Sequence, residues 1–292
     1  MRLLDALKYS TRLLEKAGIE DAFADAEVLT FHAAGADRLV AYMENPEITK
    51  ELLSKIRRVM RRRAKGEPVQ YIVGHVDFLG LTISVGKGVL IPRPETELLA
   101  EEAIAILSGQ QSAVRKKQDS GFKEFPCILD LCTGSGCIAL ALAKAFPDAE
   151  VRGTDVSKKA LRYARKNAAL NGIKNVIFFE GSLFEPVKGE KSFDLIVSNP
   201  PYIETSDIGG LQREIREWEP HEALDGGPDG LDYYRGILSV AAGYLRKDGK
   251  IVVELGFGQA KAAEEIARAS GFTNVGTKKD YAGIERILTA GV

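Results

Sequence analysis

The sequence predicts an α/β protein in which a small helical domain precedes an open, mostly parallel sheet. Apolar residues recur at helical spacing over roughly the first 65 residues, whereas the second half alternates short apolar strands with helices. The chain has 292 residues, and a domain usually has about 100 to 200. We therefore expect two domains.

Composition places the chain among ordinary globular proteins, with 45% hydrophobic and 28% charged residues. Forty Lys+Arg balance 41 Asp+Glu, a formal net charge of -1, which argues against direct nucleic-acid binding through many phosphates. The cysteines Cys127, Cys132 and Cys137 have neither the spacing nor the histidine partners of a disulfide framework or a zinc site. The chain shows no signal-peptide core and no apolar run of about 20 residues. We expect a cytoplasmic protein that binds no metal and no membrane.

Three amino-terminal stretches have helical apolar spacing: residues 3–17, followed by Gly18 as a stop, then 22–33 and 48–64. From Pro68 the pattern changes to two short β-like runs, 69–73 and 81–85, separated by glycines. These runs predict a hairpin between the two domains.

The remaining chain predicts a helix over 95–107, a polar, mobile loop over 108–125, and then strands that alternate with helices. Ligands of such sheets bind at the carboxyl ends of the strands. The expected strands cover residues 128–131, 150–154, 176–180, 193–198 and 250–255.

A glycine-containing loop follows the first strand of this sheet and opens a helix. Its residues are Cys132, Thr133, Gly134, Ser135 and Gly136. Glycines let a ligand approach the backbone, and a helix amino terminus offers free N–H groups to an anion. The pattern Gly-x-Gly-x-x-Ala also fits a dinucleotide site, so nicotinamide dinucleotides and S-adenosylmethionine both remain open here. A tight turn without a ligand is the structural alternative.

Two carboxylates bear on that choice. Asp155 ends the next strand, where it can accept hydrogen bonds from both ribose hydroxyls of an adenosine. Asp130 lies two residues before the loop, where it would repel a pyrophosphate but attract the ammonium group of a bound amino acid. This modestly favours S-adenosylmethionine. The structural alternatives are a loop hydrogen bond or helix cap for Asp130, and a cap of the helix over 157–169 for Asp155.

The tetrapeptide Asn199, Pro200, Pro201 and Tyr202 follows the strand over 193–198 and is the most informative segment. A planar NH₂ group is a poor nucleophile because its nitrogen lone pair is delocalised. The Asn199 side-chain oxygen and the Pro200 carbonyl can accept from its two N–H bonds, while Tyr202 can stack on its flat face. These features predict methylation of an amide or amino nitrogen. A rigid turn without chemistry is the structural alternative.

These motifs, together with residues 68–72 (Pro-Val-Gln-Tyr-Ile), 91–97 (Ile-Pro-Arg-Pro-Glu-Thr-Glu) and 281–286 (Tyr-Ala-Gly-Ile-Glu-Arg), resemble the release factor glutamine methyltransferases, the HemK or PrmC family. The resemblance covers almost the whole chain. It implies transfer of a methyl group from S-adenosyl-L-methionine to N5 of the glutamine in the Gly-Gly-Gln motif of peptide chain release factors.

The family resemblance also implies an architecture and roles for individual residues. We expect a helical substrate-binding domain over 1–66, a β-hairpin junction over 67–90 and a Rossmann-like class I methyltransferase domain with a seven-stranded sheet over 91–292. The loop 132–136 would wrap the methionine part of the cofactor, Asp155 would hold the ribose, Leu183 would lie near the adenine, and Asn199 would touch cofactor and substrate. Two departures are Cys132, where the family often has glycine, and Ser182, where it commonly has aspartate.

Two rival functions remain open at this point, and a third possibility, that the helical domain is purely a protein-interaction module, is compatible with the methyltransferase interpretation. An amino-group methyltransferase of nucleic acid (N6-adenine or N2-guanine) would use the same tetrapeptide on a flipped-out base, but it needs a basic recognition region that the sequence does not show. A nicotinamide-dependent oxidoreductase leaves the tetrapeptide unexplained. The basic run over 57–65 is interpreted as a solvated helix face, with docking of an acidic partner as the second choice.

Overall fold

The computed structural model describes residues 1–117, 125–190 and 193–292, with the side chains of 111–117 excepted. The chain divides into two compact units. The first comprises residues 1–75, 85–87 and 211–219, and the second comprises 76–84, 88–210 and 220–292. Each unit has a hydrophobic core of its own, which agrees with the expectation of two domains.

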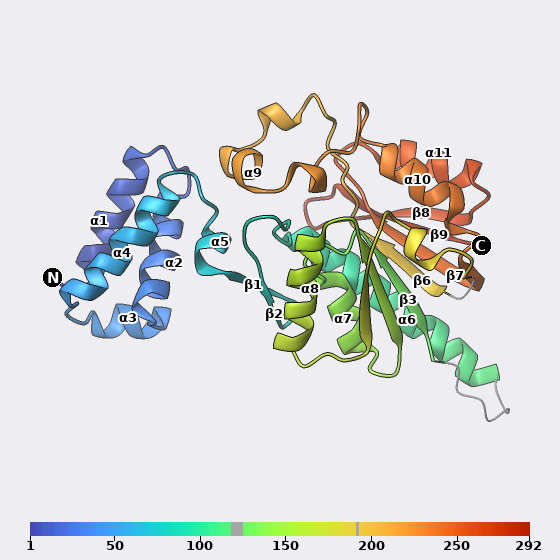
Figure 1. Cartoon of the computed structure of the whole chain (residues 1–292), viewed down its shortest axis with the longest axis horizontal. Helices are drawn as coiled ribbons and strands as arrows, with labels where there is room; N and C mark the ends of the chain where they lie inside the picture. Colours follow the sequence, from blue (N-terminus) through green and yellow to red (C-terminus); the bar gives the residue numbers. More distant parts are fainter. Residues whose placement is uncertain (118–124, 191–192) are drawn as a thin grey trace. The chain divides into compact units, whose positions relative to one another are not determined.

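The first unit is helical (Figure 1): α1 (Leu3–Lys16), α2 (Ala22–Ala34), α3 (Arg38–Glu44), α4 (Lys50–Arg63) and α5 (Val69–Val73), with α9 (Arg213–Trp218) further along the chain. The three predicted helices are confirmed within two residues. Helix α4 begins at Lys50 because the hydroxyl of Thr49 accepts from the N–H of Leu52 (3.1 Å) and caps it. Apolar side chains of these helices form one core that includes Leu7, Leu14, Leu29, Ile56, Met60 and Ile72.

Residues 69–73 form a helix, so the prediction of a strand there is wrong. Val69, Ile72 and Val73 lie at helical spacing and pack against the helical core. Gly74, with φ of 92°, then ends the helix. The hairpin itself is confirmed, with its first strand moved later: β1 (His75–Phe78) pairs with β2 (Leu81–Ser84).

The basic run over 57–65 is only partly a solvated face. Arg63 is buried and forms ion pairs of 2.5 Å with Asp25 and with Glu214. Arg62 pairs with Glu67, also at 2.5 Å. Within the first unit these two arginines therefore stabilise the helical core and its attached segment.

The second unit contains a seven-stranded sheet in the order β5-β4-β3-β6-β7-β9-β8. The first five of these strands are parallel to one another, and β9 is antiparallel to both β7 and β8. The predicted α/β class with a mostly parallel sheet is confirmed. The strands are β3 (Cys127–Leu131), β4 (Glu150–Asp155), β5 (Val176–Glu180), β6 (Phe193–Ser198), β7 (Leu245–Glu254), β8 (Thr273–Lys279) and β9 (Glu285–Gly291).

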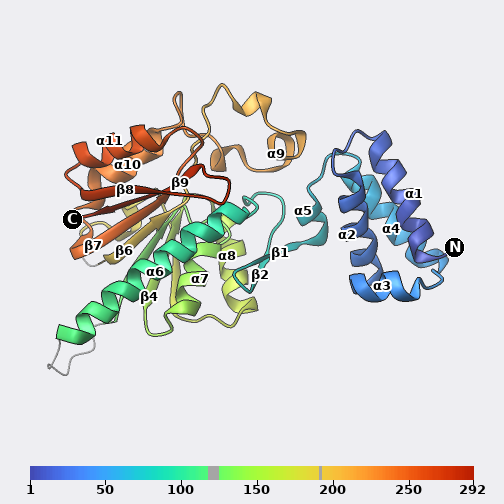
Figure 2. The same ribbon diagram turned by 180° about the vertical axis from the view of Figure 1, so that it is seen from behind.

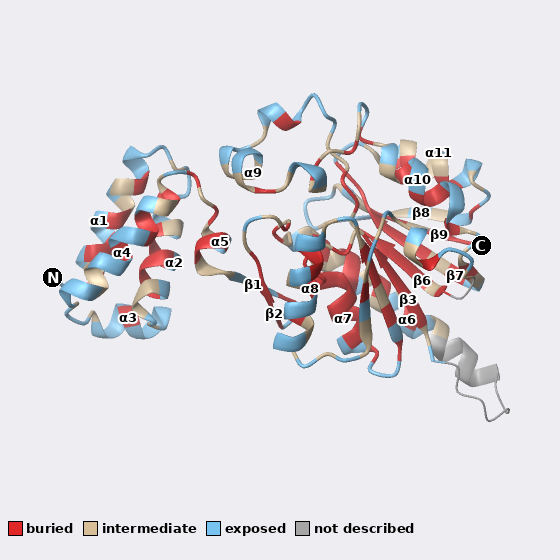
Figure 3. Ribbon diagram, viewed as in Figure 1, coloured by how far each residue is buried: buried red, intermediate tan, exposed pale blue. Residues whose placement is uncertain are grey.

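Helices cover both faces of this sheet. Figure 2 shows α6 (Pro94–Lys117) and α7 (Cys137–Ala145) on one face with α8 (Lys158–Leu170), and α10 (Asp232–Ala241) and α11 (Ala260–Ala269) lie on the other. The central strands β3 and β6 are almost entirely buried between these layers (Figure 3), whereas the edge strands β5 and β8 are largely accessible. A near-continuous apolar run in β3 and β6 is the expected consequence of burial on both faces.

Helix α6 is longer than predicted. It continues through Lys117, so the prediction of a loop is wrong for residues 108–117, and residues 118–124 lie outside the described part of the chain. The polar composition that suggested a loop is also compatible with a helix that has a weakly apolar face.

The register of the central strands determines where a ligand site can form. Leu131 of β3 pairs with Thr154 of β4 and with Ser198 of β6. The residues that follow these three positions therefore emerge together at the carboxyl edge of the sheet. Strand β3 is also where the strand order reverses direction, the usual place for a ligand crevice in this type of sheet.

Candidate active site

A pocket lies at this carboxyl edge, and its empty space of about 870 Å³ opens to solvent. It is lined by residues that follow β3, β4, β5 and β6 and by the segment before α6. The lining includes the predicted Cys132, Thr133, Gly134, Ser135, Asp155, Leu183, Asn199 and Pro201, and also Val89, Leu90, Pro92, Thr96, Ser182, Glu222 and Tyr233. Asp130, Gly136, Pro200 and Tyr202 do not line it.

The loop after β3 has three residues with positive φ, a conformation that suits glycine. Gly134 and Gly136 have φ of 54° and 81°, and a Cβ on Gly136 would lie 3.0 Å from Ala164 Cβ. Cys132 has φ of 58°, a left-handed conformation that is strained for a residue with a side chain. This explains why a glycine suits that position in the family that the sequence resembles.

Asp130 stabilises the loop through two hydrogen bonds. Its carboxylate is fully buried, and Oδ2 accepts from the Thr133 hydroxyl (2.6 Å) and the Ala139 N–H (3.1 Å). Burial raises the pKa of Asp130 to about 7, against the lowering effect of these two donors. The other oxygen, Oδ1, has no hydrogen-bond partner in the described part of the chain. The loop hydrogen bond is thus present, and an attraction for a cofactor ammonium group stays a prediction.

Asp155 lines the pocket, and both of its carboxylate oxygens accept hydrogen bonds from backbone N–H groups. Oδ2 accepts from the Gly134 N–H and Oδ1 from the Ser157 N–H, each at 2.8 Å. Burial raises its pKa, although both donors favour the charged form. The cap of α8 is Ser157, whose hydroxyl accepts from the Ala160 N–H (3.3 Å). Asp155 is therefore not the helix cap, and its place in the pocket leaves its remaining lone pairs for a ligand.

The Asn199 carboxamide is oriented by one hydrogen bond. Its Nδ2 donates to the Thr96 hydroxyl (3.1 Å), a contact across 103 residues of sequence. This contact uses the donor end of the amide, so the acceptor end, Oδ1, remains for another group. Thr96 itself is buried and lies in the first turn of α6.

Tyr202 is held from several sides and lies partly buried against the core of the second unit. Its hydroxyl donates to Oε1 of Glu254 (3.2 Å), and its carbonyl accepts from Nε2 of Gln259 (2.8 Å). Glu254 is buried, and burial raises its pKa to about 7. The predicted stacking of Tyr202 on a substrate amide stays a prediction.

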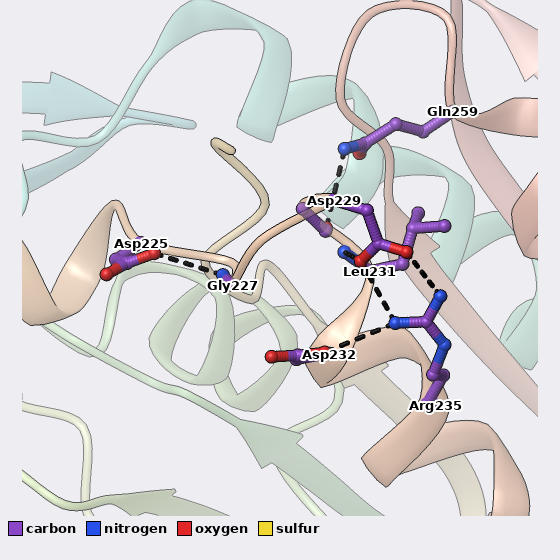
Figure 4. A network of polar contacts seen from close by, with 8 residues as sticks. Asp225, Gly227, Asp229, Leu231, Asp232, Arg235 and Gln259 are labelled. Atoms are coloured by element: carbon purple, nitrogen blue, oxygen red, sulfur yellow. Dashed lines mark hydrogen bonds and ion pairs between the residues drawn. The ribbon is translucent and has the colours of Figure 1, made fainter. Parts of the chain in front are cut away.

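Figure 4 shows a compact loop over residues 225–231 with its polar contacts. A Cβ on Gly226 would lie 2.7 Å from the Tyr202 Cα, so this approach requires glycine. Asp229 accepts from the Leu231 N–H (3.2 Å) and from the Arg235 guanidinium, which stiffens the loop. This loop was not predicted from the sequence. The three glycines and one proline within residues 226–230 are the feature of the sequence that indicates a turn there.

Ser182, the second position at which this sequence differs from the family pattern, lies next to Leu183, which is predicted to contact the adenine of the cofactor. The Ser182 N–H donates to Glu185 (3.1 Å), and Ser182 lines the pocket with an exposed side chain. Leu183, with φ of 46°, is fixed because its carbonyl accepts from the Thr154 hydroxyl (2.9 Å). Both residues line the pocket, and the contact of Leu183 with an adenine stays a prediction.

The fold and pocket define a class I methyltransferase: a seven-stranded sheet with its antiparallel strand beside β7, and a ligand pocket at the point where the strand order reverses. A crystal structure of a methyltransferase from Pyrococcus furiosus has the same fold, with a TM-score of 0.50 and 21% identity over 73% of this chain and 89% of that chain.

Sequence comparison identifies the family. Residues 5–74 match the PrmC N-terminal domain, and residues 118–215 match the methyltransferase small domain. The release factor glutamine methyltransferase of Thermodesulfovibrio yellowstonii is 48% identical over 90% of each chain. That of Geobacter sulfurreducens is 43% identical over 97% of this chain and 94% of its own. The chain belongs to the release factor glutamine methyltransferase family.

Within the described residues, no helix is long and apolar enough to cross a membrane.

Proposed function

We propose that the chain transfers a methyl group from S-adenosyl-L-methionine to N5 of the glutamine in the Gly-Gly-Gln motif of peptide chain release factors. The observation that carries the proposal is the oriented carboxamide of Asn199 at the edge of the pocket. The names of the relatives support the substrate: each of the two cited relatives is a release factor glutamine methyltransferase.

The pocket residues suit a cationic amino-acid nucleoside. Asp155 offers its free lone pairs to the ribose hydroxyls, and Leu183 packs against the adenine. The loop from Cys132 to Gly136 surrounds the methionine part. When Asp130 is ionised, its unpartnered Oδ1 adds negative charge next to that loop, and this charge attracts an ammonium or sulfonium group but repels a pyrophosphate.

S-Adenosylmethionine supplies a methyl group on a sulfonium, which is electrophilic without a metal. The S–CH₃ bond breaks as the N–CH₃ bond forms, and the nitrogen, which becomes positively charged, then loses one of its N–H protons to water. The protein has to orient the amide nitrogen and stabilise the charge that develops on it. Asn199 Oδ1 and the Pro200 carbonyl accept from the two N–H bonds of the glutamine side chain, and Pro200 and Pro201 preorganise these acceptors. Tyr202 is proposed to bound the flat face of the amide. Alignment at about 3 to 3.5 Å then supplies much of the rate.

We propose the following division of labour along the chain. Residues 1–66 form the helical domain that binds the release factor, residues 67–90 form the junction, and residues 91–292 form the methyltransferase domain. The reaction takes place in the cytoplasm, where peptide release occurs, without metal, membrane or direct nucleic-acid contact.

The experiment supplies the protein with S-adenosylmethionine labelled in the methyl group and offers a purified release factor, a DNA oligonucleotide and RNA in parallel. The proposal expects label in the release factor alone, and no label after its Gly-Gly-Gln glutamine is changed to alanine. Label in nucleic acid and none in the release factor would favour the amino-group nucleic-acid methyltransferase instead.

A further inference from the structure

A buried acid lies behind the catalytic tetrapeptide. Glu254 ends β7 and is 2% exposed, and its Oε1 accepts from the Tyr202 hydroxyl at 3.2 Å. Its other oxygen, Oε2, is buried and has no hydrogen-bond partner among the described residues. A buried carboxylate with an unpaired oxygen is unfavourable for the fold, so the position calls for a functional reason.

Thr96 lies between this acid and the tetrapeptide. Its hydroxyl accepts from Asn199 Nδ2 at 3.1 Å, and it also faces Glu254, whose pKa it lowers by hydrogen bonding. A hydroxyl has one proton and two lone pairs, whereas an ionised carboxylate can only accept. The contact with Asn199 makes the Thr96 oxygen an acceptor, so the Thr96 proton can point toward Glu254 while that acid is ionised.

We infer that Glu254 and Thr96 are positioning residues that set the direction of this hydrogen-bond chain and thereby hold Asn199 with its acceptor oxygen toward the substrate NH₂ group. The inference deepens the proposed methylation of glutamine and rests on it. A reversed chain would present the Asn199 NH₂ to the substrate NH₂, and two donors cannot form the bond that activates the nitrogen. The Tyr202 hydroxyl donates to the same carboxylate. Asn199 and Tyr202, the two ends of the tetrapeptide, are therefore both positioned through Glu254.

The protonation state of Glu254 near neutral pH depends on the groups around it. Burial raises its pKa to about 7, and Glu95 of α6 acts in the same direction. Arg286 of β9 and the hydroxyls of Thr96 and Tyr202 lower the pKa. Tyr234 of α10 donates to the main-chain carbonyl of Glu254 (3.1 Å), and Cys137 of α7 is a buried neutral thiol within its field. When Glu254 is protonated it becomes a donor toward Thr96, and the chain can reverse.

The test is a double-mutant cycle on turnover with release factor. Thr96→Val keeps the shape but removes the hydroxyl, and it should lower kcat on the order of tenfold to a hundredfold while the KM for release factor stays the same. Thr96→Ser should retain most of the activity. In an Asn199→Ala background, Thr96→Val should have no further effect, because Thr96 acts through Asn199. The matched control is Thr277→Val, which removes a threonine-to-glutamate hydrogen bond (3.1 Å, to Glu285) outside the pocket.

A second readout does not depend on turnover. The Asn199 side-chain NH₂ signals in a ¹⁵N-labelled protein are identified by their loss in Asn199→Ala. The hydrogen bond to Thr96 should separate the two proton shifts, and Thr96→Val should bring them together. The pH profile of kcat should fall below about pH 7 in the wild-type protein, and Glu254→Gln should be slow at every pH.

Two results would overturn the inference alone: an equal fall in kcat from Thr96→Val in both backgrounds, or Asn199 amide signals that ignore Thr96→Val. A wild-type protein that places no methyl group on release factor would overturn the proposed function, and the inference with it.

Discussion

Asp155→Asn separates the two roles that the structure gives to this carboxylate, as a brace for the loop and as a ligand for ribose. Both oxygens accept backbone N–H groups at 2.8 Å. Asparagine keeps one acceptor, so one of these bonds is lost. A hydrogen bond to a charged group contributes about 1.5 to 3 kcal/mol. Burial raises the pKa of Asp155, and the neutral amide avoids that desolvation, so we expect a loss of about 1.5 kcal/mol in the free energy of unfolding.

The cofactor effect is larger because the ribose presents two donors to this side chain. A carboxylate can accept both, whereas the amide accepts at one oxygen only. We expect S-adenosylhomocysteine affinity to fall by about 1.5 to 3 kcal/mol, or roughly tenfold to 150-fold in the dissociation constant. Adenosine should lose a similar factor, and L-methionine should bind as before.

The assay is isothermal calorimetry of the three ligands, with urea unfolding of each variant. Thr49→Ala serves as the control, because it removes the cap of α4 in the helical unit and should cost about 1 kcal/mol of stability with unchanged ligand affinity. If Asp155→Asn is destabilised but binds S-adenosylhomocysteine normally, Asp155 is a brace of the loop and the ribose role is refuted.

Three further predictions concern charge, packing and turnover. Asp130 and Glu254 have folded-state pKa values raised to about 7 by burial, so the native state holds more protons than the unfolded chain between about pH 4 and 7. The free energy of unfolding should therefore fall as pH rises through that window, by about 3 kcal/mol for each group. Urea unfolding measured against pH should show a weaker pH dependence for Glu254→Gln than for the wild-type protein. An equal pH dependence in the two proteins would contradict this prediction. Gly153→Ala places a Cβ 2.7 Å from a ring carbon of Phe178 and should lower stability by about 1 to 3 kcal/mol, which thermal unfolding would reveal. Asn199→Ala should reduce kcat on the order of 10² to 10³ with little change in KM, and Asn199→Asp should keep some activity; near-normal turnover with weaker binding would make Asn199 a residue for binding only.

Local patterns were sufficient to predict much of the fold. The parallel strands β5 and β6 begin and end at the residues that the sequence predicts, because their apolar runs are bounded by polar residues and glycines. Residues 69–73 were misassigned because five apolar or uncharged residues suit a strand as well as a short helix. The neighbouring helical core decides between them, and that information is not local.

Some residues of the candidate site were predictable from local sequence, and others were not. Asp155 and Asn199 were predicted because they follow strands whose carboxyl ends must meet at one sheet edge. Glu254 and Thr96 were not predicted, because their contacts with the tetrapeptide cross 52 and 103 residues of sequence. The orientation of the Asn199 amide depends on those distant partners, and no motif in the tetrapeptide specifies it.

Mapping the methyl group tests the central claim most directly. A release factor is incubated with the protein and S-adenosylmethionine, digested, and sequenced by tandem mass spectrometry. The account predicts one added methyl on the side chain of the Gly-Gly-Gln glutamine, which is absent when Asn199→Ala replaces the wild-type protein. A methyl group on another residue of the release factor, or an unmodified factor beside methylated nucleic acid, would contradict it.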